Sequence, residues 1–159
     1  MGIAVSPAIQ DYLKACYQIQ KQTGAPVTMA RVAEALEVSA PSVTNMVKRM
    51  EQLKLMTRGK SGCLKLTTKG GQIALEVIRH HRLLETFLVK TLGMDWASAH
   101  KEAEVLEHYI SERFEQLIDR YLANPTRDPH GEPIPDACGS ATPALPPTLL
   151  ECREGMRVR

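Results

Sequence analysis

The stretch that decides the fold covers residues 38–50 and reads VSAPSVTNMVKRM. It opens with a serine that can cap a helix, followed by a proline in the first helical turn, where a missing N–H costs nothing. Apolar side chains then recur at helical spacing, at Val43, Met46, Val47 and Met50. The sequence therefore predicts a helix here, with one face turned to a core.

The segments on either side of this helix predict a winged helix-turn-helix. Residues 8–22 have helical spacing and end at Gly24-Ala25-Pro26, and a second helix starts near Thr28. Two short helices joined by a tight turn form a helix-turn-helix. After the third helix, LMTRGKSGCLKLTTKG (residues 55–70) has the pattern of strand, glycine-containing turn and strand. Such a hairpin is the wing.

The rest of the chain predicts helices and then a linker. Thr68 is expected to cap a long helix that ends at Gly93, and a further helix to run from Asp95 or Ser98 to about Ala123. We therefore predict a mainly α fold. Its parts are a winged helix-turn-helix domain with a small β-hairpin wing (1–72), a helical domain (73–124), a proline-rich linker (125–147) and a strand-like tail (148–159).

Charge is distributed unevenly along the 159 residues. Residues 28–72 hold eight basic and three acidic side chains, whereas the remainder holds 12 basic and 15 acidic ones. This asymmetry suggests a different partner for each half. The chain has no run of 18 apolar residues, no secretion-signal pattern in MGIAVSPAIQ and no CxxC pair among its four cysteines. We therefore expect no membrane span and a cytoplasmic location.

The basic half predicts a DNA-binding surface. Small hydroxyls, an amide and a proline ring near the start of the third helix suit base edges, and nearby cations suit phosphates. The candidates are Ser39, Pro41, Ser42, Thr44, Asn45, Lys48, Arg49, Arg58 and Lys60. For a lone helix, an ordinary solvated face is the competing interpretation. The basic hairpin that follows favours DNA.

The acidic half predicts a metal site. At 100° per residue, one strip of the predicted helix carries His100, Glu104, Glu107 and His108. Carboxylates one turn apart repel each other unless a cation lies between them. On the preceding helix His81 and Glu85 also share a face. Imidazole with carboxylate and no thiolate suits Mn²⁺, Fe²⁺, Zn²⁺ or Co²⁺, and ordinary surface residues are the alternative.

Five motifs over residues 9–135 carry a resemblance to the diphtheria toxin repressor family of metal-dependent regulators, and to its manganese-transport branch. They are DYLKACY (11–17), VSAPSVTNMVKRM with the basic hairpin, HHRLLETFL (80–88), HKEAEVLEH (100–108) and GEPIP (131–135). The resemblance implies a primary metal site and an ancillary one. The primary ligands would be Asp11, Glu104, Glu107 and His108, and the ancillary ligands His81, Glu85 and His100.

The resemblance also bears on which metal is bound. Iron-responsive members tend to have Met and Cys where this chain has Asp11 and Glu104. Hard oxygen ligands favour Mn²⁺, with Fe²⁺ as the alternative and Zn²⁺ or Co²⁺ as substitutes. Lys14 replaces a glutamate that two-metal members use, so we expect two separate sites. Cys16 is an alternative ligand near Asp11. Larger members continue into an SH3-like domain, and TLLECREGMRVR (148–159) resembles its opening strand, which suggests a truncation or a short variant.

The function implied is a metal-dependent transcriptional repressor of metal homeostasis that binds a palindromic double-stranded operator as a homodimer. A cation shared by Asp11 and the later helix would fix a first helix that is mobile without metal. One rival is a metal-independent winged-helix regulator of an organic ligand. A remote rival is a metallohydrolase, because EVLEH approaches H-x-x-E-H, although Glu104 replaces its first histidine.

Overall fold

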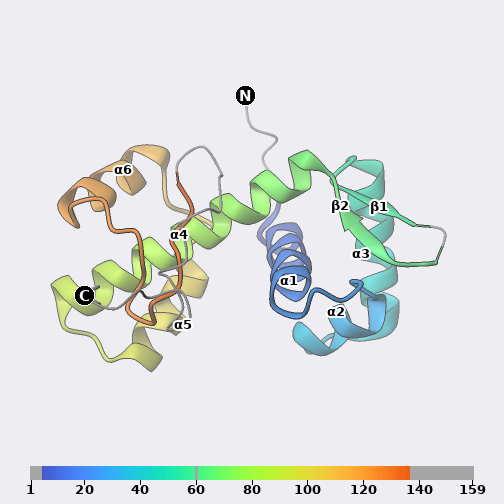
Figure 1. Cartoon of the computed structure of the whole chain (residues 1–159), viewed down its shortest axis with the longest axis horizontal. Helices are drawn as coiled ribbons and strands as arrows, with labels where there is room; N and C mark the ends of the chain where they lie inside the picture. The colour runs from blue at the N-terminus through green and yellow to red at the C-terminus, as the bar shows by residue number, and fades with distance from the viewer. Residues whose placement is uncertain (1–4, 60, 137–159) are drawn as a thin grey trace, which may run out of the picture.

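The computed structural model describes residues 5–59 and 61–136, and Figure 1 shows how their elements are arranged. Three helices and a hairpin come first, followed by three more helices. The elements are α1 (Pro7–Thr23), α2 (Met29–Ala35), α3 (Ala40–Gln52), β1 (Met56–Arg58), β2 (Leu64–Leu66), α4 (Thr68–Leu92), α5 (Trp96–Leu106) and α6 (Glu112–Tyr121). The predicted mainly α fold with a β-hairpin wing is confirmed.

The winged helix-turn-helix is built around the apolar face of α3. Val43, Val47 and Met50 are fully buried, and each such side chain stabilises the fold by about 1.5–3 kcal/mol relative to exposure. Ser39 caps the helix as predicted, accepting a hydrogen bond from the Ser42 N–H. In the turn before α3, Glu37 adopts a positive φ of 53°, the left-handed conformation that glycine usually provides after a helix.

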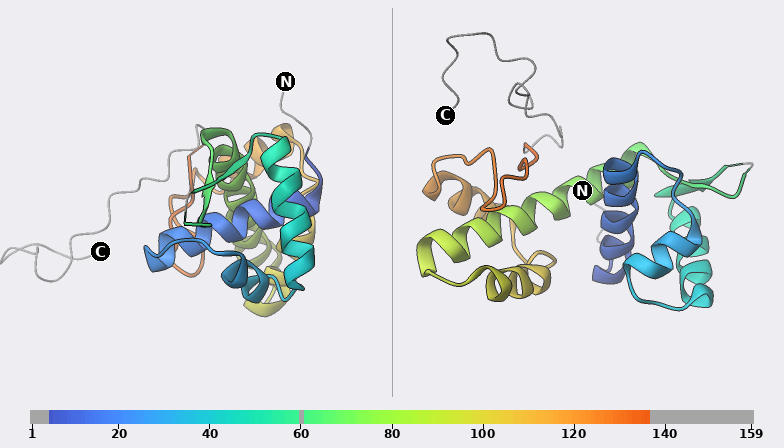
Figure 2. Two further views of the ribbon diagram at one scale, coloured as in Figure 1. Left: turned by 90° about the vertical axis from the view of Figure 1, so that its right-hand side faces the viewer. Right: turned by 60° about the horizontal axis from the view of Figure 1, so that its bottom comes forward.

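Helix α4 is shared by two cores and crosses the whole molecule in Figure 1. Its start contributes Ala74 to the core of the winged helix, and its end contributes Leu83 and Leu84 to a second core with α5 and α6. Figure 2 shows the same division from two further sides. The N-cap is Thr67, one residue before the predicted Thr68, and its hydroxyl accepts from the Gly70 N–H.

The predicted single helix from Asp95 to Ala123 is wrong, because it breaks between Leu106 and Glu112. Asp95 does cap α5, but Ser111 caps a new helix by accepting from the Phe114 N–H. The break changes which side chains face the core. Beyond it Ile118 is buried, whereas three large apolar side chains of α6 are exposed: Phe114, Leu117 and Tyr121.

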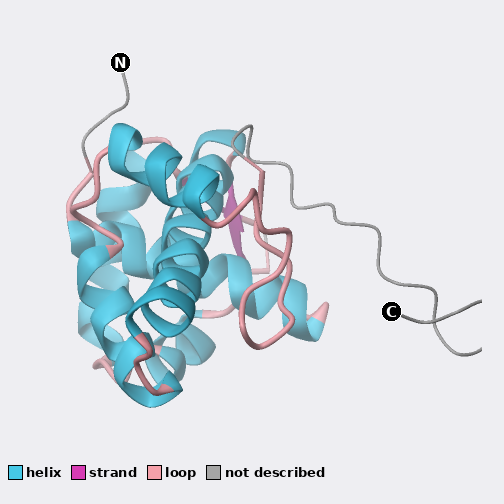
Figure 3. Cartoon of the chain, turned by 90° about the vertical axis from the view of Figure 1, so that its left-hand side faces the viewer, coloured by secondary structure: helices cyan, strands magenta, loops and turns pink. Residues whose placement is uncertain are grey.

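The first twelve residues of the predicted linker pack against the helical domain. Ile134 belongs to the second core, and Arg79 of α4 donates to the Pro135 carbonyl at 2.7 Å. Arg82 donates to the Pro133 carbonyl. Figure 3 shows these loops lying along the helices. The remainder of the linker and the strand-like tail lie outside the described residues. No helix in the described ranges combines the length and apolar character needed to cross a membrane.

Candidate metal centre

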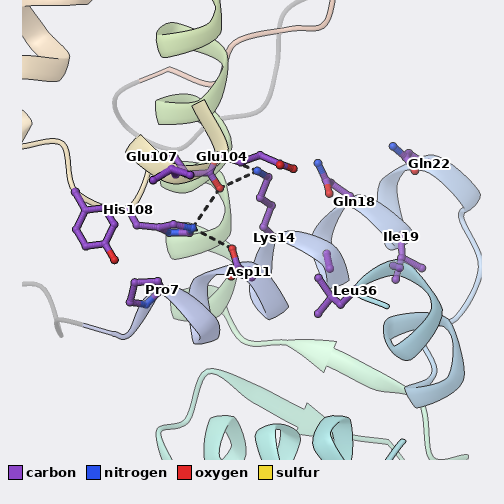
Figure 4. Close-up of a pocket in the computed structure, with 14 residues that line it drawn as sticks. Pro7, Asp11, Lys14, Gln18, Ile19, Gln22, Leu36, Glu104, Glu107 and His108 are labelled. Atoms are coloured by element: carbon purple, nitrogen blue, oxygen red, sulfur yellow. Dashed lines mark hydrogen bonds and ion pairs between the residues drawn. The ribbon is translucent and has the colours of Figure 1, made fainter. Parts of the chain in front are cut away.

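A cavity of about 570 Å³ opens where α1 passes the end of α5. One face of α1 lines it, together with the end of α2 and the residues that follow α5. Figure 4 shows Asp11 and Lys14 pointing from α1 toward Glu107 and His108. The two halves of the chain therefore meet at this cavity, and each contributes ionisable side chains to its wall.

Three of the four predicted primary ligands come together here, and we name Asp11, Glu107 and His108 the interdomain group. Each offers a donor atom within 4.8 Å of the others. The Nε2 atom of His108 lies 3.0 Å from Asp11 Oδ1 and 3.7 Å from Glu107 Oε1. Asp11 belongs to α1, whereas the other two follow α5, so the group joins the DNA-binding half to the helical half.

Gln10 fixes which nitrogen of His108 faces the group. Its Oε1 atom lies 2.6 Å from His108 Nδ1. The Nε2 atom is therefore the one that faces Asp11 and Glu107, and in the tautomer with its proton on Nδ1 it could ligate a cation. Two carboxylates and one imidazole nitrogen meet at this point. This donor set fits a divalent cation, and the carboxylate–imidazole combination fits Mn²⁺ or Fe²⁺.

The fourth predicted primary ligand, Glu104, stands apart from the interdomain group. It lines the same cavity, but its side chain is 55% exposed and pairs with His100 Nε2 at 3.4 Å. The helix wheel placed Glu104 beside Glu107 on one strip. In the structure α5 ends at Leu106, so Glu107 and His108 leave the helix and turn toward α1 while Glu104 stays on its surface.

The predicted ancillary ligands also come together, and we name His81, Glu85 and His100 the α4–α5 group. Their donor atoms lie within 4.8 Å of one another. His100 Nδ1 lies 3.2 Å from both His81 Nε2 and Glu85 Oε1. All three side chains come from the helical domain. Glu85 is almost completely buried, and its carboxyl group finds its polar partners among these neighbours.

His130 contacts the α4–α5 group through Glu85, and sequence reasoning missed this contact. Its Nε2 atom lies 3.3 Å from Glu85 Oε1, and its ring makes an edge contact with Trp96 at 4.9 Å between centroids. His130 lies in the segment predicted to be a linker. The histidine within DPHGEPIP (128–135) can be seen in the sequence. Because it lies in a loop, no helical spacing indicates which residues it would contact.

Glu107 connects the two groups. Its Oε2 atom lies 2.6 Å from His81 Nδ1, and Lys14 Nζ donates to both of its oxygens at 2.8 and 2.9 Å. Burial opposes ionisation of Glu107, but His81 and Lys14 outweigh it and hold its pKa below the usual value. Burial, opposed by His108 and reinforced by Glu107, raises the pKa of Asp11. Glu107 is therefore stabilised as a carboxylate at the junction of the two groups.

His80 holds the break between α5 and α6, and this role was not predicted. Its Nδ1 atom lies 3.0 Å from the Glu107 carbonyl oxygen and its Nε2 atom 3.2 Å from Glu115 Oε2. Burial lowers the pKa of His80, but these two acceptors outweigh it and raise the pKa above the usual value. The protonated ring can donate to both acceptors at once.

Cys16, the alternative ligand near Asp11, points elsewhere. It is 1% exposed within the winged-helix core, and burial raises the pKa of its thiol to about 12. A thiol that stays protonated in an apolar core is a poor metal ligand.

The predicted DNA-binding residues lie on the start of α3 and on the wing. Pro41, Asn45, Lys48 and Arg49 are exposed, as is Arg58 on β1, which pairs with Glu51 at 3.4 Å. Ser39 and Ser42 are also exposed, but the Ser39 hydroxyl is used as the helix cap. Thr44 is half-buried, and its hydroxyl donates to the Ala40 carbonyl at 3.0 Å. Lys60 lies outside the described residues.

The fold and these groups define a class: a winged helix-turn-helix joined to a helical domain whose carboxylates and histidines could hold metal ions. The family described as iron dependent repressor, N-terminal DNA binding domain, matches residues 4–60. The family described as iron dependent repressor, metal binding and dimerisation domain, matches residues 67–136. The second range begins at residue 67, inside the predicted first domain, and continues through the loop that ends at residue 136.

Known relatives agree with these matches. The iron-dependent repressor IdeR of Mycobacterium leprae is 42% identical over 124 residues, which is 78% of this chain and 54% of that protein. A manganese-dependent transcriptional repressor solved with manganese is 41% identical, with a TM-score of 0.80 over 91% of this chain and 66% of that one. ScaR with bound Zn²⁺ is 35% identical, with a TM-score of 0.77 over 92% and 68%.

The chain belongs to the iron-dependent repressor family, which includes the diphtheria toxin repressor. It spans about half the length of IdeR.

Proposed function

We propose that the protein is a metal-dependent transcriptional repressor that controls metal-ion homeostasis in the cytoplasm, with Mn²⁺ as its activating ion. One observation carries this proposal: Asp11 of the first domain meets Glu107 and His108 of the second. A bound divalent cation would supply the positive charge that holds these acceptors together. Fe²⁺ is the alternative, because carboxylate–imidazole sets accept both ions.

The chain's own residues would convert this site into control of DNA binding. Asp11 ties α1 to the helical domain, and α1 packs against α2 and α3 in the winged-helix core. Fixing α1 therefore fixes the orientation of the exposed face of α3. The free energy available is the difference in metal affinity between the fixed and the loose arrangement. Lys48, Arg49 and Arg58 would bind phosphates, and Asn45 a base edge.

A homodimer would present two such faces to DNA. Several large apolar side chains of the helical domain are exposed, namely Leu92, Trp96, Val105, Tyr109, Phe114, Leu117 and Tyr121. Apolar surface of this extent is typical of protein interfaces. Two-fold symmetry then predicts a palindromic operator with half-sites about one helical turn, or roughly 34–36 Å, apart.

The competing functions lack a comparable observation. A regulator of an organic ligand does not require buried carboxylates that converge with histidines. A metallohydrolase based on EVLEH needs Glu104 among the ligands, whereas Glu104 pairs with His100 on the surface of α5. We infer that the protein is a regulator and not an enzyme.

The experiment that tests the proposal begins with DNA selected from a random pool by the protein in Mn²⁺. Fluorescence anisotropy then measures binding of that DNA in EDTA and after Mn²⁺ or Fe²⁺ is restored, the latter without oxygen. We expect binding to be lost in EDTA and recovered with the activating ion. Arg49→Ala should weaken binding and make it less dependent on salt. Equal affinity with and without metal would disprove the proposal.

A further inference from the structure

Lys14 occupies the position where a cation would bridge the two groups. It lies one turn after Asp11 on α1, and its Nζ atom donates to both oxygens of Glu107. The same atom is 3.4 Å from His81 Nδ1. Figure 4 shows its side chain reaching across the cavity to Glu107. The side chains of Lys14 and Glu107 are 14% and 1% exposed, so solvent screens this ion pair little.

This ion pair opposes metal binding. Glu107 is the carboxylate that the helical domain contributes to the interdomain group, and both of its oxygens already accept from the Lys14 ammonium. A metal ion that uses Glu107 must displace that ammonium or bind beside it, against the repulsion of like charges. The free energy of the ion pair is therefore subtracted from the free energy of metal binding.

The same ion pair substitutes for metal in the metal-free protein. Lys14 and Asp11 lie on the same helix, so the bond from Lys14 to Glu107 joins the same two domains. Breaking it would leave Glu107 as a buried carboxylate with less compensation. Through this contact Lys14 would hold α1 against the helical domain in part when no metal is bound.

We propose that Lys14 is an internal cation that competes with the activating metal for Glu107 and thereby sets the metal concentration at which the repressor responds. This inference rests on the proposed function. It makes an unusual prediction: removal of Lys14 should strengthen metal binding and loosen the metal-free protein, because one ion pair is responsible for both effects. A lysine that only stabilised the fold would leave metal affinity unchanged or weaken it.

The test compares Lys14→Met, which keeps length and loses charge, with Lys14→Arg, which keeps charge. Lys21→Met, on an exposed position of the same helix, is the matched control. Isothermal titration with Mn²⁺ should show Lys14→Met binding about 10-fold more tightly than the parent, a coupling of ordinary size between two ligands of one site. Lys14→Arg and Lys21→Met should bind like the parent.

Thermal unfolding covers the case in which Lys14→Met is unstable. In EDTA the unfolding midpoint of Lys14→Met should be below the midpoint of the parent. Mn²⁺ should raise the midpoint of Lys14→Met by more than it raises the midpoint of the parent. The distance between spin labels at positions 48 and 101 can be measured with the native cysteines replaced. In EDTA its distribution should be broader in Lys14→Met than in the parent. In Mn²⁺ the two distributions should be the same.

Two outcomes would overturn the inference in different ways. If the parent binds Mn²⁺ and Lys14→Met binds it equally or more weakly, Lys14 does not compete, and the proposed function stands. If neither protein binds Mn²⁺ or any of its substitutes, the proposed function fails and the role of Lys14 fails with it.

Discussion

The interdomain group and the α4–α5 group have similar donors but differ in where these come from. Asp11, Glu107 and His108 come from both domains, whereas His81, Glu85 and His100 all come from the helical domain. On the proposed function, an ion in the interdomain group would sense how the domains are oriented, because its ligands are complete only when α1 lies against the end of α5. An ion in the α4–α5 group would stabilise one domain whichever way the other faces. Similar chemistry would then serve regulation in one place and stability in the other.

The largest effect is expected at Glu107, which belongs to one group and contacts the other. Glu107→Gln keeps the shape of the side chain but removes the charge that Lys14, His81 and His108 surround. Loss of outer-shell partners of a metal costs about 10–100-fold in affinity, so the loss of this ligand should cost more than about 100-fold. Anisotropy with the selected DNA measures it. Mn²⁺-dependent binding within a few-fold of the parent would remove Glu107 from the site.

Asp11→Asn and Glu85→Gln form a matched pair that tests the comparison directly. Each replaces one carboxylate by its amide. Asp11→Asn does so in the interdomain group, and Glu85→Gln does so in the α4–α5 group. Asp11→Asn should weaken Mn²⁺-dependent DNA binding by about 10–100-fold. Its metal-free binding at low salt should equal that of the parent, because the basic surface is untouched.

Glu85→Gln should instead reduce the thermal stabilisation that Mn²⁺ gives to the protein. Its DNA affinity in saturating Mn²⁺ should stay within about 10-fold of the parent, below the typical cost of a site that controls binding. Differential scanning calorimetry and anisotropy provide the two measurements. Equal losses of DNA affinity in both variants would show that the groups are not divided as the structure suggests.

The sequence predicted those parts of the fold and site that depend on a local period. The apolar face of α3, the cap at Ser39 and the hairpin all follow from spacing within a few residues, and the structure confirms them. Spacing also placed His81 and Glu85 on one helix face, whereas His100 was joined to them only by the family resemblance, and the structure brings the three together. A regular helix turns sequence spacing into direction, so such residues can be placed from sequence alone.

The misses occur where that regularity stops. Ser111 followed by Glu112 is a signal for the start of a helix. It was overlooked because apolar residues recur at helical spacing both before and after it. The unrecognised break divides the one predicted helix into α5 and α6. Contacts of His130, Lys14 and His80 join segments far apart in the chain. No periodicity reports such contacts; only the packing of α4 against its neighbours brings them together.

His80 allows a pH test of the interdomain group alone. Its ring contacts the carbonyl of Glu107, and no contact with Glu85 or His100 is seen in the described residues. The pKa of His80 is raised in the folded state, because Glu115 and that carbonyl outweigh burial. Its stabilising contribution is therefore fully present below pH about 6.5, the unfolded value, and is lost as the pH rises through the folded pKa.

Chemical unfolding of metal-free parent and His80→Phe measures this contribution between pH 6 and pH 9. The difference in free energy of unfolding should be about 2 kcal/mol at the acid end, as for a hydrogen bond to a charged group, and should shrink toward the alkaline end. The pKa of Glu115 is lowered, chiefly by its hydrogen bond from His80, so Glu115→Gln should remove most of the pH dependence. A difference that grows with pH would contradict the assignment.

The smallest effect on metal binding is expected at Cys16, the other α1 residue considered as a ligand. Cys16→Ala should change Mn²⁺ affinity by less than about 2-fold, because its thiol lies in the winged-helix core and stays protonated. In a chain with the other cysteines replaced, iodoacetamide should leave the folded protein unmodified and should label Cys16 in denaturant. A loss of affinity comparable to that of Asp11→Asn would mean that α1 contributes a sulfur ligand. The interdomain group would then contain a soft donor, and its preference would move from Mn²⁺ toward Fe²⁺ or Zn²⁺.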